Sequence, residues 1–249
     1  MTLHQANLHA TLPGFHPHRT SNPRAREAEQ HGHRQRVRDR FLTAGADATP
    51  DEELLELVLF RAIPRREVRS LARRLLATFG DFNNVISASS NRLAGIQGVG
   101  SSVIQELKIV EAAAHTMART KVMNRDVLSS WDALLAYCRT KMAHMEREQF
   151  RVLFLDRRNT LIADEALQTG TVDHVPVYPR EIVKRALELN ASAIILVHNH
   201  PSGDATPSQE DIAMTKQVQR GTDVLGLTLH DHLIIGRLGN YSFRSHGLI

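Results

Sequence analysis

Apolar residues recur with the period of an α-helix through the first half of the chain, up to about residue 120. In segment 51–63, Leu55 and Leu59 lie one turn apart on the same side, and Pro64 ends the pattern. Further helices are predicted at residues 66–80, at residues 81–89 and, after a glycine hairpin at 96–100, over a long segment to about residue 120. This half of the chain is therefore predicted to be all-helical.

The second half combines apolar runs of strand length with helical segments. Strands are predicted at residues 149–156, 159–170, 192–198, 225–236 and 240–245, and helices at 131–145, 179–190 and 208–221. These elements indicate a mixed β-sheet flanked by helices, with functional residues at the end of a central strand. The predicted fold class is therefore α+β, with an all-helical domain at 37–120 and a sheet domain at 121–249.

Composition narrows the class of protein further. A chain of 249 residues with 42% hydrophobic residues can bury the cores of two domains, which excludes global disorder and a fibrous chain. Apolar stretches stay well below the roughly 18 residues of a membrane span, and the N-terminus lacks the apolar run of a signal peptide. We therefore expect a cytoplasmic protein that does not enter a membrane. The single cysteine, Cys138, excludes a cysteine-rich zinc module.

The net charge of +4 is concentrated at the N-terminus. Five arginines and two acidic residues give residues 1–36 a charge of +3, while residues 37–120 carry +1 and residues 121–249 are neutral. The first segment also holds six of the 14 histidines and shows no periodicity, which predicts a disordered His/Arg-rich tail at 1–36. A solvated extension is the simpler interpretation, and a basic arm that contacts nucleic-acid phosphates is the alternative.

Two histidines at the end of the apolar strand give the sharpest chemical signal. His198 and His200 are two residues apart, so their side chains point to the same face of the strand. Asp211 follows after a loop rich in proline, serine and glycine, in the first turn of the next predicted helix. Two imidazoles and one carboxylate leave the fourth position of a tetrahedral zinc ion open for water, as in catalytic sites. These residues therefore predict one zinc ion per chain.

Each of these residues also has a simpler explanation, because a histidine at a strand end is usually a surface residue and Ser208 could only cap a helix. The combination is more specific. The run His198-Asn-His200-Pro-Ser-Gly, followed by Pro-Ser208 and Asp211, resembles the JAMM zinc motif of MPN/JAB metalloproteases in their RadC-like branch. The resemblance covers about residues 37–249 and implies a cytidine-deaminase-like sheet. It also includes Gly170-Thr171, Tyr178-Pro179, Asp231-His232 and the 98–100 hairpin.

The family resemblance implies roles for two further residues. Ser208 would position or stabilise the oxyanion that forms on a peptide or isopeptide carbonyl. Members of the family supply the general base from a glutamate well upstream, at the start of the first strand, and Glu148 fits this place. Its competitors are Glu146, Glu165 and Glu181, of which the last two have a local structural explanation in a strand and in a first helical turn.

The helical half carries a second functional signal. Gly98 and Gly100 form a hairpin ahead of a helix N-terminus, where free backbone N–H groups can hold a phosphate, and this resembles the helix-hairpin-helix motif of DNA-binding proteins. Arg66, Arg69 and Arg73 would form a basic side on the neighbouring helix. A glycine turn without nucleic acid and a solvated helix that binds protein are the competing interpretations.

Two hypotheses follow from the sequence. The first is a zinc-dependent metalloprotease or isopeptidase, a hydrolase of the RadC/JAMM type whose partner is a peptide or protein substrate. The second is a DNA-binding accessory protein of DNA repair or recombination, in which the metal site is structural or vestigial and DNA contacts the helical domain and the basic tail.

Overall fold

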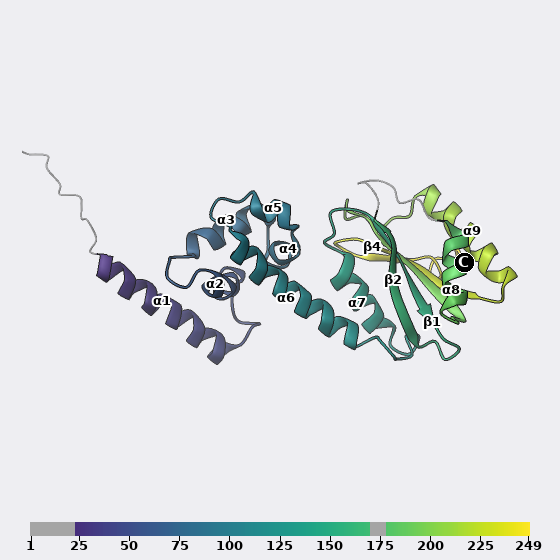
Figure 1. Ribbon diagram of the computed structural model, residues 1–249, viewed down its shortest axis with the longest axis horizontal. Coiled ribbons are helices and arrows are strands. Elements are labelled where there is room, and N and C mark those ends of the chain that lie inside the picture. The colour runs from purple at the N-terminus through teal and green to yellow at the C-terminus, as the bar shows by residue number, and fades with distance from the viewer. Residues whose placement is uncertain (1–22, 170–177) are drawn as a thin grey trace, which may run out of the picture.

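The computed structural model describes residues 23–169 and 178–249, in which a helical domain is followed by a helix-flanked sheet (Figure 1). Gly170 and Thr171, which belong to the family resemblance, lie outside the described residues, as does segment 1–22 of the predicted tail. The α+β fold class predicted from the sequence is confirmed. Among the described residues, no helix is long and apolar enough to cross a membrane.

The helical domain consists of short helices packed on one long helix. Its elements are α1 (Pro23–Ala44), α2 (Asp51–Ala62), α3 (Arg69–Phe79), α4 (Phe82–Ser87), α5 (Ser90–Ala94) and α6 (Ser101–Thr120). Apolar side chains from these helices, including Leu55, Leu75 and Leu107, form one buried core. Sequence signals set the element ends, since Pro50 precedes α2 and the Asp81 carboxylate accepts a hydrogen bond from the Asn84 N–H at the start of α4.

The prediction of a disordered tail over residues 1–36 is wrong for residues 23–36, which belong to helix α1. The helix is fixed to its domain by polar contacts that apolar periodicity does not reveal. The buried guanidinium of Arg34 donates to the carbonyl oxygens of Ile63 and Arg66, at 2.6 Å each, and lies over the ring of Phe60. One turn further on, Val37 is buried in the core. Charged groups therefore stabilise this segment where an apolar stripe is lacking.

The sheet has five strands in the order β2-β1-β3-β4-β5. The strands are β1 (Gln149–Leu155), β2 (Leu161–Thr169), β3 (Ala193–Asn199), β4 (Thr228–Ile235) and β5 (Asn240–Ser242). Strands β3 and β4 run parallel, and the other neighbouring pairs are antiparallel. Strand β3 is central and entirely buried, which explains its continuous apolar sequence.

Helices cover both faces of this sheet and divide it into two cores. Helix α7 (Trp131–Met142) packs on one face, whereas α8 (Pro179–Glu188) and α9 (Gln209–Val224) pack on the other (Figure 1). Alternation along β3 sends Ile195 and Val197 toward α7, and Ile194 and Leu196 toward α8 and α9. The last residues of β3 continue this alternation, so His198 faces the helix that carries Asp211.

The segment between α6 and α7 packs against the sheet domain. Val122 and Val127 are buried in the core under α7, and Met123 and Asp126 form isolated bridges with Leu161 and Thr160, at the start of β2. The two domains also meet through polar contacts, including an ion pair between Arg92 and Glu146. These contacts hold the helical domain beside the sheet domain.

Candidate metal centre

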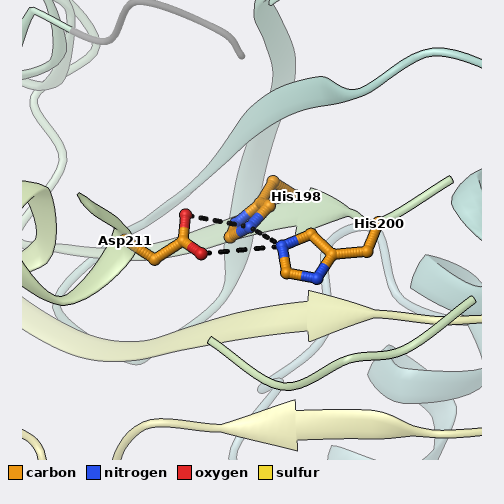
Figure 2. A group of neighbouring side chains, drawn as sticks. All are labelled: His198, His200 and Asp211. Atoms are coloured by element: carbon orange, nitrogen blue, oxygen red, sulfur yellow. Dashed lines mark hydrogen bonds and ion pairs between the residues drawn. The ribbon is translucent and has the colours of Figure 1, made fainter. Parts of the chain in front are cut away.

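The three predicted metal ligands meet at the end of the central strand (Figure 2). The Nε2 atoms of His198 and His200 are 3.0 Å apart, Asp211 Oδ1 lies 3.2 Å from His198 Nε2, and Asp211 Oδ2 lies 3.5 Å from His200 Nε2. Bonds of about 2.0–2.1 Å to a tetrahedral ion would place ligand atoms about 3.4 Å apart. The donor set and its spacing therefore fit zinc.

Electrostatics favour the charge distribution that a metal needs. Burial opposes the charge on Asp211, but the neighbouring side chains of His198, His200 and Ser208 outweigh this effect and hold the pKa of the carboxyl well below its ordinary value. The hydrogen bond with Asp211 raises the pKa of His200, against a smaller opposing effect of burial. Because Asp211 stays ionised, the cluster offers a negative charge to a cation.

Ser208 fixes the aspartate through a capping box at the start of α9. Its hydroxyl donates to Asp211 Oδ2 at 2.7 Å and accepts from the Asp211 N–H at 3.1 Å, while its own N–H donates to Oδ2 at 2.8 Å. The helix-cap interpretation is therefore correct, and the same contacts orient Asp211, the predicted metal ligand. In this conformation the Ser208 hydroxyl proton is used by Asp211 rather than directed at a substrate.

The loop between His200 and Ser208 is held in place by close backbone packing. His200 Nδ1 bonds the carbonyl oxygen of Asp204 at 2.7 Å, which leaves Nε2 to face the other ligands. Gly203 has a φ of +94°, and a Cβ atom at Gly236 would overlap the Gly203 carbonyl oxygen. Glycine at position 236 therefore allows the loop to fold against the end of β4.

Glu148 precedes β1 at the edge of the site. Strand register pairs Phe150 with His198, so the residues just before β1 run alongside the residues just after β3. After the hydrogen bond to Asp211, the charge of Glu148 is a smaller cause of the raised pKa of His200, in agreement with this placement.

The competing glutamates are engaged elsewhere. Their partners are arginines: Glu146 pairs with Arg92, Glu165 with Arg185 and Glu181 with Arg180.

The segment around Glu148 is tied to β3 by a residue that sequence reasoning missed. Asn199 is buried on the opposite face from His198, and its Nδ2 donates to the carbonyl oxygens of Arg147, at 3.1 Å, and Met145, at 3.4 Å. Its Oδ1 accepts from the Gln149 N–H at 2.9 Å. The residue between the two histidines therefore fixes the backbone on both sides of Glu148.

A second missed feature lies beneath His198. Its Nδ1 atom is 2.8 Å from Nε2 of the fully buried His232, whose Nδ1 is 2.6 Å from the hydroxyl of Thr215. Burial, and the nearby His198, lower the pKa of His232 well below its ordinary value. Thr215 follows Asp211 by one turn of α9, and this spacing is the signal from which its place could have been predicted.

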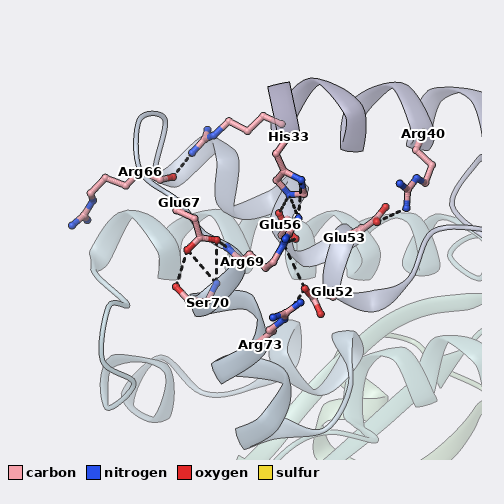
Figure 3. Close-up of polar contacts among 11 residues, drawn as sticks. His33, Arg40, Glu52, Glu53, Glu56, Arg66, Glu67, Arg69, Ser70 and Arg73 are labelled. Carbon is pink, nitrogen blue, oxygen red and sulfur yellow. Dashed lines mark hydrogen bonds and ion pairs between the residues drawn. The ribbon is translucent and has the colours of Figure 1, made fainter. Parts of the chain in front are cut away.

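The helical hairpin has the predicted backbone shape. Gly98 is exposed with a φ of +96°, and Gly100 is the N-cap residue of α6. The arginines of the neighbouring helix do not form a separate basic side, because Arg69 and Arg73 pair with glutamates of α2 (Figure 3). The side chain of Arg66 extends outward in Figure 3 and is exposed.

A helix-flanked mixed sheet with two histidines and an aspartate at the end of its central strand is the arrangement expected of a JAB domain, and comparison with known families agrees with this class. The RadC-like JAB domain family matches residues 128–248, and the UPF0758 N-terminal family matches residues 29–104. The molecule is therefore a RadC-like JAB domain that follows a helical UPF0758 N-terminal domain. The predicted resemblance to the RadC-like branch is confirmed.

Relatives extend the match over both domains. A UPF0758 protein of Ruegeria pomeroyi is 66% identical over 217 residues, which cover 87% of this chain and 97% of the relative. A UPF0758 protein of Rhodobacter capsulatus is 66% identical over 213 residues, 86% of this chain and 100% of the relative. The chain belongs to the UPF0758 family of RadC-like JAB-domain proteins.

Proposed function

We propose that this protein is a zinc-dependent hydrolase that cleaves a peptide or isopeptide bond. The observation that carries the proposal is the convergence of His198, His200 and Asp211 at spacings of 3.0 to 3.5 Å, which suit a tetrahedral ion. Zinc bound there would polarise the substrate carbonyl and lower the pKa of its water toward neutrality. Three protein ligands leave a fourth position for this chemistry.

The proposed role of Glu148 is general acid and base. Its place just before β1, which runs alongside the end of β3, and the effect of its charge on the pKa of His200 support the transfer of a proton from the attacking water to the leaving amine. Ser208 has two roles in the proposal. Its hydroxyl holds Asp211 in the observed structure, and it would have to turn away from Oδ2 to donate to the oxyanion of a tetrahedral intermediate.

Digestion of a peptide library that includes isopeptide-linked substrates tests this proposal. Zinc-loaded wild-type protein should cleave a subset of the library, and Glu148→Gln should lose this activity. Glu146→Gln is the matched control, because Glu146 is two residues away and pairs with Arg92. Equal cleavage by wild type and Glu148→Gln would refute the base assignment. If the wild-type protein carries one zinc ion and cleaves no member of the library, the proposed hydrolase function is refuted.

A second proposal is sequence-independent DNA contact by the helical domain, which leaves the zinc site structural. The exposed hairpin of Gly98 and Gly100 at the N-terminus of α6 favours it. The ion pairs of Arg69 and Arg73 weigh against a strong arginine contribution. Filter binding of duplex DNA at two salt concentrations tests it, because phosphate contacts predict a steep loss of affinity with salt. A weak and salt-independent response would exclude it.

A further inference from the structure

A chain of buried hydrogen bonds joins two of the proposed metal ligands from behind. It runs from His198 Nδ1 to His232 Nε2 at 2.8 Å, from His232 Nδ1 to the Thr215 hydroxyl at 2.6 Å, and from that hydroxyl to the Asp211 carbonyl oxygen at 2.6 Å. His198, His232 and Thr215 are each at most 1% exposed, so water does not compete for these contacts. The chain therefore begins at one ligand and ends at another.

The direction of every proton in this chain follows from its last acceptor. The Asp211 carbonyl can only accept, so the single hydroxyl proton of Thr215 points toward it. The Thr215 oxygen must then accept from His232 Nδ1–H, and the neutral His232 ring keeps a bare Nε2. That Nε2 accepts from His198 Nδ1–H, so the neutral ring of His198 has its lone pair on Nε2, directed at Asp211 and His200.

We propose that His232 and Thr215 are positioning residues, which hold His198 in the single tautomer that can bind a metal through Nε2. The inference rests on the metal site of the proposed function and adds residues that do not touch the ion. It concerns the free protein as well, because the hydrogen bonds orient the ring before an ion arrives. His200 is held differently, since its Nδ1–H donates directly to the Asp204 carbonyl.

Loss of the Thr215 hydroxyl should allow His198 to adopt the tautomer that cannot bind a metal through Nε2. Without an acceptor at Nδ1, His232 can carry its proton on Nε2 and donate it to His198 Nδ1, which moves the His198 proton to Nε2. Zinc must then displace a proton and reverse both tautomers. Loss of such an outer hydrogen-bond partner lowers metal affinity by about 10- to 100-fold in known sites. We expect a loss in this range for Thr215→Val, which keeps the shape of the side chain.

The experiment is competition for zinc between the full-length protein and a chelator of known affinity. Thr222→Val is the matched control, because Thr222 is also buried in α9 and its hydroxyl also bonds a helix carbonyl, that of Gln219, at 2.8 Å. Thr222→Val should keep wild-type zinc affinity within about 3-fold, and Thr215→Ser should restore most of the affinity that Thr215→Val loses. If wild type binds zinc and the Thr215→Val and Thr222→Val proteins bind it with equal affinity, the positioning role is overturned while the proposed function stands.

Nitrogen-15 NMR of the zinc-loaded wild-type protein reads the tautomers directly. The proton should reside on Nδ1 in both His198 and His232, and a proton on His232 Nε2 would overturn the inference. A wild-type protein that binds no zinc in the competition experiment would instead overturn the proposed function, and the positioning role with it. The two failures are therefore distinguishable.

Discussion

Asn199 offers the sharpest test of how the site is assembled, because its side chain bonds the backbone around Glu148 without belonging to the metal cluster. The substitution Asn199→Ala removes one hydrogen bond accepted from Gln149 N–H and two donated to the carbonyls of Met145 and Arg147. The 3.4 Å contact to Met145 is the weakest of the three. The two shorter bonds contribute about 1 kcal/mol each, and backbone groups left without a partner in the interior add about 1–3 kcal/mol. We expect the free energy of unfolding to fall by about 3–5 kcal/mol.

Urea denaturation followed by circular dichroism measures this change. Asn91→Ala is the control, because Asn91 is exposed on α5, and we expect its effect to stay within about 0.5 kcal/mol. Zinc content should remain one per chain in Asn199→Ala, while cleavage should fall because Glu148, the proposed base, is no longer held. Equal stability of the Asn199→Ala and Asn91→Ala proteins, or unchanged cleavage in Asn199→Ala, would refute the reasoning.

Two further predictions concern the scaffold. Gly236→Ala should lower the free energy of unfolding by about 1–3 kcal/mol, because the new Cβ atom overlaps the Gly203 carbonyl oxygen. Gly239→Ala is the control, since a Cβ atom at this position of the same turn meets open space and should change the free energy of unfolding little. Equal melting midpoints of the two variants would contradict this account. Arg34→Met should lower the free energy of unfolding by about 2–3 kcal/mol, because two charge-assisted hydrogen bonds are lost. Arg36→Met is the control, since Arg36 is exposed and its loss should leave the free energy of unfolding unchanged. If α1 stays as resistant to protease in Arg34→Met as in wild type, Arg34 does not anchor the helix.

Apolar periodicity predicted most of the fold because most elements bury a regular stripe or face. The continuous apolar run of β3 indicated a central strand, and the structure places it there. Periodicity failed for residues 23–36, since Arg34 anchors α1 through backbone carbonyls whose positions depend on the tertiary fold. A contact of this kind has no local sequence pattern.

The cluster of His198, His200 and Asp211 could be predicted because its geometry is local. His198 lies in β3, His200 follows the strand directly and Asp211 lies in the first turn of α9, so sequence spacing was enough to predict that the three side chains come together. Asn199 and His232 were not assigned roles, because their partners are 17 to 54 residues away in sequence. Arg69 and Arg73 show the opposite error, since a helical face that looks basic by itself is neutralised by another helix.

Metal content of the purified protein tests the central claim most directly. Elemental analysis of wild type should give one zinc per chain, His200→Ala should retain only a small fraction of it, and His115→Ala, a change in helix α6 of the other domain, should retain all of it. Wild type without stoichiometric zinc, or His200→Ala with the same zinc content as wild type, would contradict the account.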